Sequence, residues 1–354
     1  ATHAVELEAD AVRSVFLFTD GLANEGITQA DKLVELLQKM LDRTPRVRVY
    51  TFGYGADHSS DMLQRIAEAG GGTYYFIENE ENIPRAFADA LGGLLSVAAQ
   101  NVEVTFEPAD GVRVLEAHTT YRTRGEGAGA RTVCVGDLFC NEGKDVLFDV
   151  RLPALAAPDA AAPVGTLRLA FLDVYGARIA TQELVCTVAR PAKAPVERRA
   201  SAAVVMQKAR VTTAKTLNGA KEECDKRRYE VAKDLMKKQM EAMSLVQRQV
   251  AGDEVSVAMA SGLVADLQEA LDDMVDEATY KYRGSKKMCS KAAEHWNQRT
   301  AALSDDEEEQ ESGQKKFSYA TAAQKEMRGE AKSSVLQLSP TQMWGWGGVG
   351  ILGP

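Results

Sequence analysis

The side chains that could do chemistry are few, and the thiols among them form no recognisable site. No two cysteines form a Cys-x-x-Cys pair, so a zinc ribbon or RING within this chain is excluded. We interpret them as reduced thiols of an intracellular protein, with a redox role for the first two as the alternative. The five cysteines are Cys134, Cys140, Cys186, Cys224 and Cys289.

The histidines and glycines likewise carry no catalytic signature. His58 follows Asp57 at the expected start of a short helix, and His118 and His295 have no partner pattern. The glycines at 53–55 and 70–72 fit turns better than a phosphate-binding loop, because neither opens a long helix with Lys followed by Ser or Thr. No Ser/His/Asp or Cys/His signature is present, and we predict a non-enzymatic protein.

Length and composition are those of a multidomain globular chain. The 354 residues correspond to two or three domains of about 150 residues. No apolar run approaches the roughly 18 residues that span a bilayer, so we predict no membrane span. The net charge of −9 disfavours general nucleic-acid binding, which needs a basic face. Nothing at the start resembles a signal peptide, and we expect a cytoplasmic protein.

The first hundred residues alternate between short apolar runs and segments with helical periodicity. We expect Thr28 or an adjacent residue to cap the first helix and Ser59 or Ser60 to cap the second. Alternating strands and helices at this spacing predict a parallel sheet with helices on its faces. The predicted strands are 13–18, 47–52 and 73–77, and the predicted helices are 27–42, 59–69 and 82–98.

After the first hundred residues the sequence pattern changes twice, first to alternating strands and then to helical periodicity. Residues 100–190 contain alternating strands that predict an antiparallel β-sandwich, with 153–163 as an exposed loop. Residues 197–300 are expected to be helical, with 200–250 and 254–282 forming a hairpin whose methionines pack in the core. The hairpin's halves should face each other, because residues 197–250 carry a charge of +6 and residues 251–283 a charge of −6. We predict that residues 301–354, with the acidic run 305–311, form a disordered tail.

One set of motifs resembles a known family. Val15–Gly21, followed by Asn24, resembles the fourth strand and third metal-site loop of von Willebrand factor type A domains. Three further segments match the next strand, the last strand and the closing helix: Thr51–His58, Ile66–Asn79 and Ala86–Val97. The resemblance implies that residues 1–99 are the C-terminal half of a doubly wound type A domain whose N-terminal part is missing. The strand at 13–18 would then form an apolar, unpaired edge.

A second resemblance concerns the rest of the chain. Val135–Phe139 with Glu142 resembles a Gly-Asp-Leu segment of the β-rich region that follows type A domains in a eukaryotic multidomain group. Members of that group carry a helical Vwaint domain. Residues 197–300 are similar to it in their position along the chain and in their helical sequence pattern. Some relatives add a RING, U-box or Hint module. The predicted architecture is therefore multidomain α/β, β and α.

The type A resemblance implies a divalent cation, Mg²⁺ or Mn²⁺, at the carboxyl edge of the sheet. The family takes its ligands from an Asp-x-Ser-x-Ser loop, a Thr and the Asp of a Thr-Asp-Gly loop, and a partner protein donates a carboxylate. Of these ligands only Asp20 is present here, and Thr19 would support Asp20 without binding the metal itself. One carboxylate cannot hold Mg²⁺ usefully in water, so we expect no metal to be bound by this chain by itself. A turn residue before Gly21 is the alternative role for Asp20.

Three functions fit these expectations. The first is a non-enzymatic scaffold that recruits a protein partner through the type A domain and the sandwich. The second is the substrate-recruiting part of an E3 ubiquitin ligase whose RING or U-box module is absent here. The third is a truncated gene product without metal function.

Overall fold

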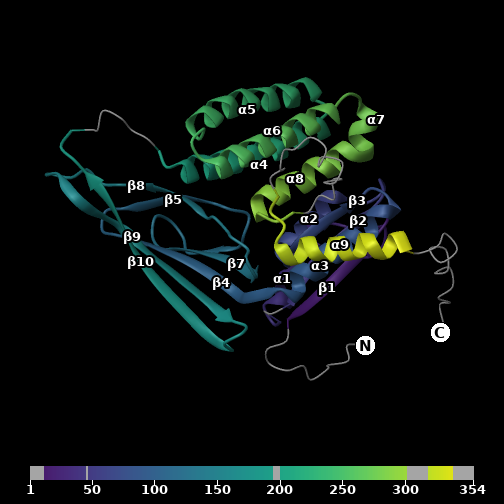
Figure 1. The fold of residues 1–354 in the computed structure, drawn as a ribbon, viewed down its shortest axis with the longest axis horizontal. Coiled ribbons are helices and arrows are strands. Elements are labelled where there is room, and N and C mark those ends of the chain that lie inside the picture. The colour runs from purple at the N-terminus through teal and green to yellow at the C-terminus, as the bar shows by residue number, and fades with distance from the viewer. Residues whose placement is uncertain (1–11, 45–46, 194–199, 301–317, 338–354) are drawn as a thin grey trace.

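The computed structural model describes residues 12–44, 47–193, 200–300 and 318–337. Along the chain it contains a parallel sheet with helices, two antiparallel sheets and a group of helices (Figure 1). The predicted mixture of a parallel α/β sheet, antiparallel strands and helices is confirmed. None of the described helices is long and apolar enough to cross a membrane.

The first part of the fold is a three-layer α/β unit. Its parallel sheet has the order β1-β2-β3, with β1 at Arg13–Thr19, β2 at Val47–Tyr54 and β3 at Gly71–Ile77. Successive strand side chains point to opposite faces, so Tyr50 and Phe52 pack towards α3 while Tyr74 and Phe76 pack towards α2. The helices are α1 (Ala30–Leu41), α2 (Ser60–Ala69) and α3 (Ile83–Leu95), with a short 3₁₀ turn at Glu80–Asn82 before α3.

The helix ends confirm the predicted cap of α2 and correct the predicted end of α3. Ser59 caps α2, because its side chain accepts a hydrogen bond from the N–H of Met62 at 3.3 Å. The N-cap of α1 is Gln29, adjacent to Thr28 and within the predicted position, but it makes no side-chain capping bond. Helix α3 ends at Leu95, short of the predicted residue 98, because residues from Val97 onward join the next sheet.

The second part is an antiparallel sandwich with unequal layers. The larger sheet has the order β10-β9-β4-β7-β6, and β5 pairs with β8 in the smaller one. Val102, Val133 and Val135 form its core, and Ala117 and Phe148 of the smaller sheet pack against them. The strands are β4 (Val97–Pro108), β5 (Arg113–His118), β6 (Thr123–Arg124), β7 (Arg131–Phe139), β8 (Leu147–Arg151), β9 (Asp159–Asp173) and β10 (Arg178–Arg190). The loop predicted over 153–163 is shorter than expected, since β9 begins at Asp159 and pairs with β10 from there.

The helical part is a bundle, so the predicted two-helix hairpin is wrong. The segment expected as one helix over 200–250 breaks after Asp225, because the next three residues are charged and Arg227 adopts a left-handed φ of 60°. The N–H of Arg227 donates to the carbonyl of Cys224 at 2.8 Å and closes the helix end. The elements are α4 (Ala202–Asp225), α5 (Tyr229–Gln249), α6 (Glu254–Asp272), α7 (Glu277–Thr279), a π turn (Tyr280–Gly284) and α8 (Ser285–Asn297).

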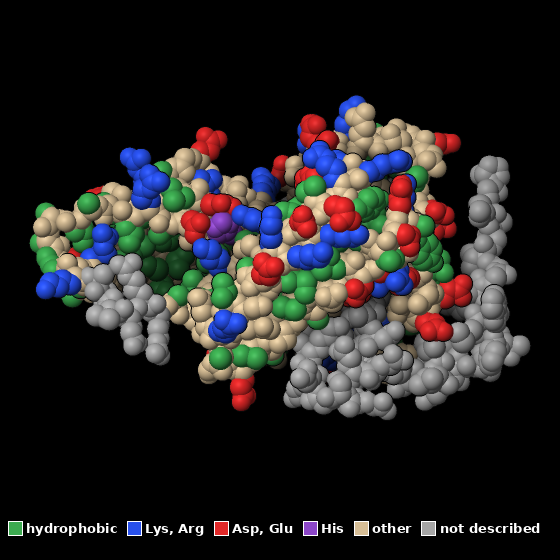
Figure 2. Space-filling view, turned by 90° about the horizontal axis from the view of Figure 1, so that it is seen from above, with side chains coloured by type: hydrophobic (Ala, Val, Ile, Leu, Met, Phe, Trp, Pro, Cys, Tyr) green, Lys and Arg blue, Asp and Glu red, His purple; other side chains and the backbone are tan. Residues whose placement is uncertain are grey.

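The methionine prediction is confirmed, and the predicted halves do face each other, since α6 packs on both α4 and α5, but the charges of α6 are neutralised mainly elsewhere. Six buried methionines line the bundle core, at positions 206, 236, 243, 259, 274 and 288. The acidic face of α6 is neutralised by α8, since Lys291 lies 3.0 Å from Asp266 and Lys287 lies 3.0 Å from Glu269. Between the two predicted blocks, Arg227 and Glu277 approach to 3.8 Å. Acidic and basic side chains mix over the helices on the face seen in Figure 2.

A last helix corrects the predicted tail. Helix α9 (Ala322–Gln337) lies along α3 (Figure 1), where a Cβ added to Gly92 would lie 3.0 Å from Cα of Gln324. The buried carboxylate of Asp89 accepts hydrogen bonds from Tyr75 at 2.8 Å and from Gln324 at 3.1 Å, and it forms an ion pair with Arg328 at 2.6 Å. The disordered tail is therefore wrong for 318–337, while the acidic run 305–311 lies outside the described residues.

Candidate functional site

Thr19 and Asp20 lie together at the carboxyl edge of the parallel sheet. The Thr19 hydroxyl donates to the carbonyl of Gly21 at 3.2 Å and accepts from its N–H at 3.3 Å, which closes a tight turn. The Asp20 side chain is exposed to solvent. Within the described part of the chain, no group of three or more His, Cys, Asp or Glu side chains is placed to hold a metal ion. Asp20 offers one carboxylate at this turn, and one carboxylate does not fit Mg²⁺ or Mn²⁺, which needs several oxygen ligands in an octahedral shell.

The strand that leads to Asp20 forms one end of the described sheet. Strand β1 pairs in parallel with β2, and Thr19 lies opposite Gly53. Val15, Leu17 and Phe18 are 49%, 39% and 48% exposed, so the strand is apolar and open to solvent, as the resemblance implied.

The histidines have structural partners that the sequence did not reveal. Nε2 of His58 lies 2.7 Å from the Tyr74 hydroxyl, and burial lowers the pKa of His58, which favours the neutral ring. His118 lies between Glu116 at 2.8 Å and Asp149 at 3.0 Å, and Nε2 of His295 lies 3.1 Å from Asp266. These contacts hold elements together.

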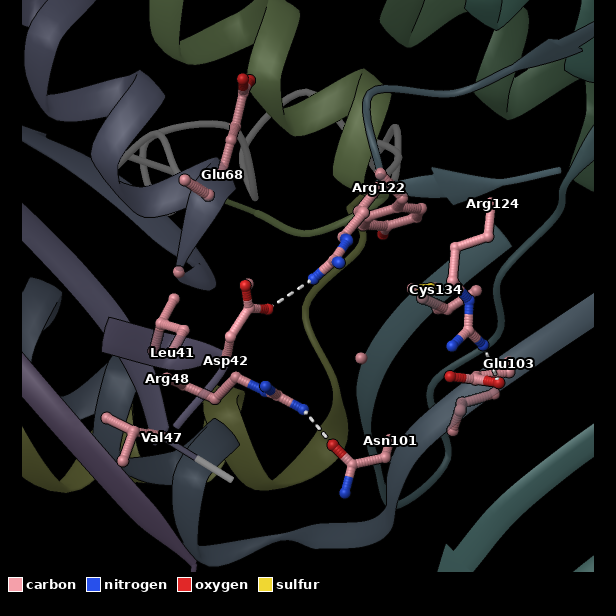
Figure 3. A pocket seen from close by; sticks show the side chains of 17 residues that line it. Leu41, Asp42, Val47, Arg48, Glu68, Asn101, Glu103, Arg122, Arg124 and Cys134 are labelled. Atoms are coloured by element: carbon pink, nitrogen blue, oxygen red, sulfur yellow. Dashed lines mark hydrogen bonds and ion pairs between the residues drawn. The ribbon is translucent and has the colours of Figure 1, made fainter. Parts of the chain in front are cut away.

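A polar cleft lies at the opposite, amino edge of the parallel sheet, where the α/β unit meets the sandwich. Its volume is about 370 Å³, and a neighbouring hollow of about 280 Å³ shares Leu41, Glu68, Ala69 and Arg122 with it. One wall comes from the end of α1, the start of β2 and the end of α2, and the other comes from β4, β6 and β7 (Figure 3). Clefts between domains are frequent binding sites, so this one is the leading candidate.

Three arginines project into the cleft, and each has an oxygen partner (Figure 3). Arg122 contacts Asp42 at 3.1 Å, and Arg124 contacts Glu103. Arg48 donates to Asn101 at 3.2 Å and also forms a buried ion pair with Asp137 at 2.6 Å.

The accessibility of these ion pairs differs sharply. The side chains of Arg122 and Asp42 are 66% and 59% exposed, whereas those of Arg48 and Asp137 are 11% and 4% exposed. Exposed ion pairs contribute roughly 0–1 kcal/mol, so a ligand carboxylate could exchange with Asp42 at little cost. A buried ion pair resists exchange of its carboxylate for that of a ligand, so Arg48 holds the walls of the cleft together. The guanidinium groups available to a ligand are those of Arg122 and Arg124.

The cleft wall also includes Cys134, for which redox chemistry with Cys140 is the alternative role. Burial raises the pKa of the Cys134 thiol, which disfavours the reactive thiolate. Glu68 on the opposite wall also has a raised pKa because of burial. The arginines are therefore the leading candidates for contacts with a ligand in this cleft.

Behind the cleft, the Gly-Asp-Leu segment joins all three parts of the chain. Asp137 binds Arg48 of β2, and Glu142 binds Arg299, which follows α8, through contacts of 2.7 and 3.0 Å. Arg299 also donates to the carbonyl of Asp137 at 2.6 Å, and its guanidinium carbon lies 4.0 Å from the ring centre of Phe139. We call Asp137, Phe139, Glu142 and Arg299 the junction.

The electrostatics of the junction support a fixed arrangement. Burial by itself would raise the pKa of Glu142, but the charges of Arg299 and Lys144 outweigh it and lower the pKa to about 2. Burial lowers the pKa of Lys144 to about 7, and its side-chain nitrogen lies 2.7 Å from Glu142 and also donates to the carbonyls of Asn297 and Gln298. The α/β unit, the sandwich and the bundle are thus held by buried charged groups whose partners are satisfied.

One local signal for the cleft is present in the sequence. Arg122 and Arg124 are two residues apart, and this spacing places both side chains on one face of an extended segment. Their position opposite Asp42 and Glu68 depends on how the sandwich packs on the α/β unit. That packing could not be read from local periodicity, so the cleft was not among the predicted sites.

Comparisons with known proteins support the family resemblance. Residues 2–76 match the profile of the von Willebrand factor type A domain. The chain is 28% identical over 153 residues to the E3 ubiquitin-protein ligase WAV3 of Arabidopsis thaliana, covering 42% of this chain and 18% of the ligase. It is 25% identical over 145 residues to the uncharacterized protein YfbK of Escherichia coli strain K12, covering 40% of this chain and 25% of YfbK.

A solved structure extends the likeness beyond the matched segment. A von Willebrand factor type A protein from Catenulispora acidiphila superposes with a TM-score of 0.58 at 13% identity, over 81% of this chain and 65% of that one. The fold is therefore of the type A kind, and the predicted resemblance is confirmed. The chain spans about a fifth to a quarter of the length of the two curated relatives. The Vwaint assignment of 197–300 and the missing part of the type A domain stay predictions.

Proposed function

We propose that the chain is a non-enzymatic protein-interaction module that binds its partner in the cleft between the α/β unit and the sandwich. The observation that carries the proposal is the pair of arginines, Arg122 and Arg124, exposed in a cleft whose walls are held by buried ion pairs. A rigid cleft loses little conformational entropy on binding. The type A fold agrees with this role, because domains of this family mediate protein interactions.

The arginines define the chemistry of the partner. A guanidinium group presents a planar fork of donors that matches a carboxylate in a bidentate arrangement. Arg122 and Arg124 are engaged by the exposed carboxylates of Asp42 and Glu103, which a ligand would replace with carboxylates of its own. We therefore expect a peptide segment that carries Asp or Glu side chains at two neighbouring positions.

Selection from a random peptide library tests this proposal. The wild-type chain should enrich peptides rich in Asp and Glu, and the double variant Arg122→Glu, Arg124→Glu should lose them. A matched control, Lys237→Glu with Arg248→Glu on α5, changes the net charge equally at exposed positions far along the chain and should retain them. Enrichment that survives in the cleft variant, or disappears equally in the control, would contradict the assignment.

A second candidate function is substrate recruitment within a ubiquitin ligase. The observation that favours it is the 28% identity to WAV3 over 153 residues. In this case the helical region 197–300 would correspond to a Vwaint-type domain, and another module would supply ligase activity. A discharge assay with ubiquitin-loaded E2 enzymes separates this proposal from an enzymatic one. We expect no discharge by this chain, and discharge would refute both proposals.

We further propose that this chain by itself holds no divalent metal through Asp20. Titration of Mg²⁺ and Mn²⁺ by calorimetry should give no binding heat, whereas an intact family domain would use Asp20 and a carboxylate donated by its partner. Binding that is abolished by Asp20→Ala would refute the proposal. A cytoplasmic location is also proposed, and the support for it is that all five cysteines are free thiols.

A further inference from the structure

Strand β10 is a long edge strand that is open to solvent on both faces. It ends the five-stranded sheet, where its pairing partner in the described structure is β9 on one side. Ile179, Leu184 and Val185 are 78%, 63% and 70% exposed. Figure 1 shows the β9–β10 hairpin at the side of the sandwich that faces away from the helices. The outer edge thus presents backbone donors and acceptors between apolar side chains.

The other described sheet edges are mostly protected. Strand β6 has two residues, one of them Arg124, and β3 is buried apart from its first residue and contacts α8. Natural edge strands avoid association through short length, proline, lysine or coverage by another element. β10 has 13 residues and contains neither proline nor lysine. In the described part of the chain, the shorter β1 has a comparable exposed edge, and β5 and β8 of the two-stranded sheet have six and five residues.

The apolar side chains of β10 lie on both faces of its sheet. Leu184 lies opposite Leu167 of β9, which in turn lies opposite the buried Phe106 of β4, so Leu184 continues the inner face of the sandwich. Ile179 and Val185 have the other parity and lie on the outer face with Glu183. A strand added beside β10 would cover apolar groups on both faces, which a globular partner resting on one face would not do.

We propose that β10 pairs with β10 of a second copy of this chain, in antiparallel orientation about a two-fold axis at Gln182. The pairing of β10 with β9 is regular from Arg178 to Cys186 and shifts register after Cys186, so the regular stretch has nine residues and Gln182 at its centre. In this register Ile179 lies opposite the partner's Val185, and Ala180 lies opposite the partner's Leu184. The two five-stranded sheets become one continuous sheet, and this dimer goes beyond the proposed cleft function.

The charges of β10 disfavour two of the neighbouring registers. An axis at Leu184 would place Arg178 opposite the partner's Arg190, and an axis at Glu183 would place two glutamates opposite each other. Like charges directly across a strand pair are destabilising. With the axis at Gln182 no like charges face each other, and Glu183 is already neutralised by Arg168 at 2.7 Å. A second copy is thus self-complementary to this edge.

Sedimentation velocity over about 5 to about 500 µM tests the proposal, because small interfaces have dissociation constants towards the upper end of that range. The wild-type chain should shift from monomer to dimer with concentration. The variant Leu184→Lys, Val185→Lys should raise the dissociation constant at least tenfold. Val255→Lys, at a residue that is 70% exposed on α6, should leave it unchanged.

The competing edge provides the decisive comparison. Val15→Lys with Leu17→Lys places the same charges on β1 and should leave the β10 dimer intact. A wild-type chain that stays monomeric throughout, or a dimer lost in the β1 variant and retained in the β10 variant, would overturn the proposal. Hydrogen exchange of the unmodified chain provides a test that needs no substitution. Amides of residues 178–186 should become more protected with concentration, and unchanged protection there in a dimer would also refute it.

Discussion

Arg299→Ala is the substitution that should loosen the three parts of the chain most directly. The guanidinium group of Arg299 binds both carboxylate oxygens of Glu142, donates to the carbonyl of Asp137 and lies over the ring of Phe139. Alanine removes all of these contacts at once. It also leaves the carboxylate of Glu142, whose side chain is 2% exposed, with Lys144 as its ion-pair partner.

The expected loss follows from burial. Removing one partner of a buried ion pair costs about 3–5 kcal/mol, because the remaining charge loses its compensation. Lys144 stays 2.7 Å from Glu142, so the lower limit of about 3 kcal/mol applies. The guanidinium contact with Phe139 adds about 1 kcal/mol. The total of about 4 kcal/mol corresponds to roughly a thousandfold change in the opening equilibrium.

Hydrogen exchange of the Phe139 amide measures this loss locally, because that N–H donates to Glu142 at 2.9 Å. Its protection should fall roughly a thousandfold in Arg299→Ala. The control is Arg124→Ala in the same sheet, where the side chains of Arg124 and Glu103 are 52% and 37% exposed. That exposed pair should contribute less than about 1 kcal/mol. An Arg299→Ala effect no larger than the control would refute the view that the junction holds the parts together.

Two further predictions concern acid stability and the docking of α9. The folded-state pKa of Glu142 is about 2, below its ordinary value of 4.5, so its contribution to stability is present above pH 4.5 and is lost as the pH falls towards 2. Glu142→Gln should therefore be less stable than wild type at pH 7. Its free energy of unfolding, measured by denaturant titration, should fall less than that of wild type between pH 4.5 and pH 2, and an equal fall in both proteins would contradict this. Gly92→Ala should weaken the docking of α9 and speed proteolysis there, because the new Cβ would lie 3.0 Å from the backbone of α9. Gly219→Ala in α4 meets nothing within 4 Å and should stabilise the chain by up to about 1 kcal/mol, and equal effects of both alanines would refute the close approach.

Local patterns in the sequence located most elements of the α/β unit and the sandwich. The segments before Thr19 and before Tyr54 became β1 and β2, because both are rich in β-branched and aromatic residues, which favour strands. The break after Asp225 could not be predicted, because the helical periodicity resumes at Tyr229 and only the left-handed Arg227 separates the two helices. Helix α9 could not be predicted either, because its sequence is weakly amphipathic and its position depends on the buried carboxylate of Asp89.

The candidate sites also differ in whether the sequence could predict them. The Thr19-Asp20 turn could be read from the sequence, because its hydrogen bonds join residues two positions apart. The cleft could not, because Arg122 and Asp42 are separated by 80 residues along the chain and meet only when the sandwich packs on the α/β unit.

The sequence by itself determined the strands and helices of the α/β unit, the methionine core and the type A resemblance, since these depend on residues within a few positions of one another. The tertiary structure decided which carboxylate neutralises which cation, and hence where the cleft and the junction lie. Arg299 and Glu142 are 157 residues apart, and Gln324 and Asp89 are 235 apart. Contacts of that separation form only where several elements pack and exclude water together, because burial makes the pairing of each charged group obligatory.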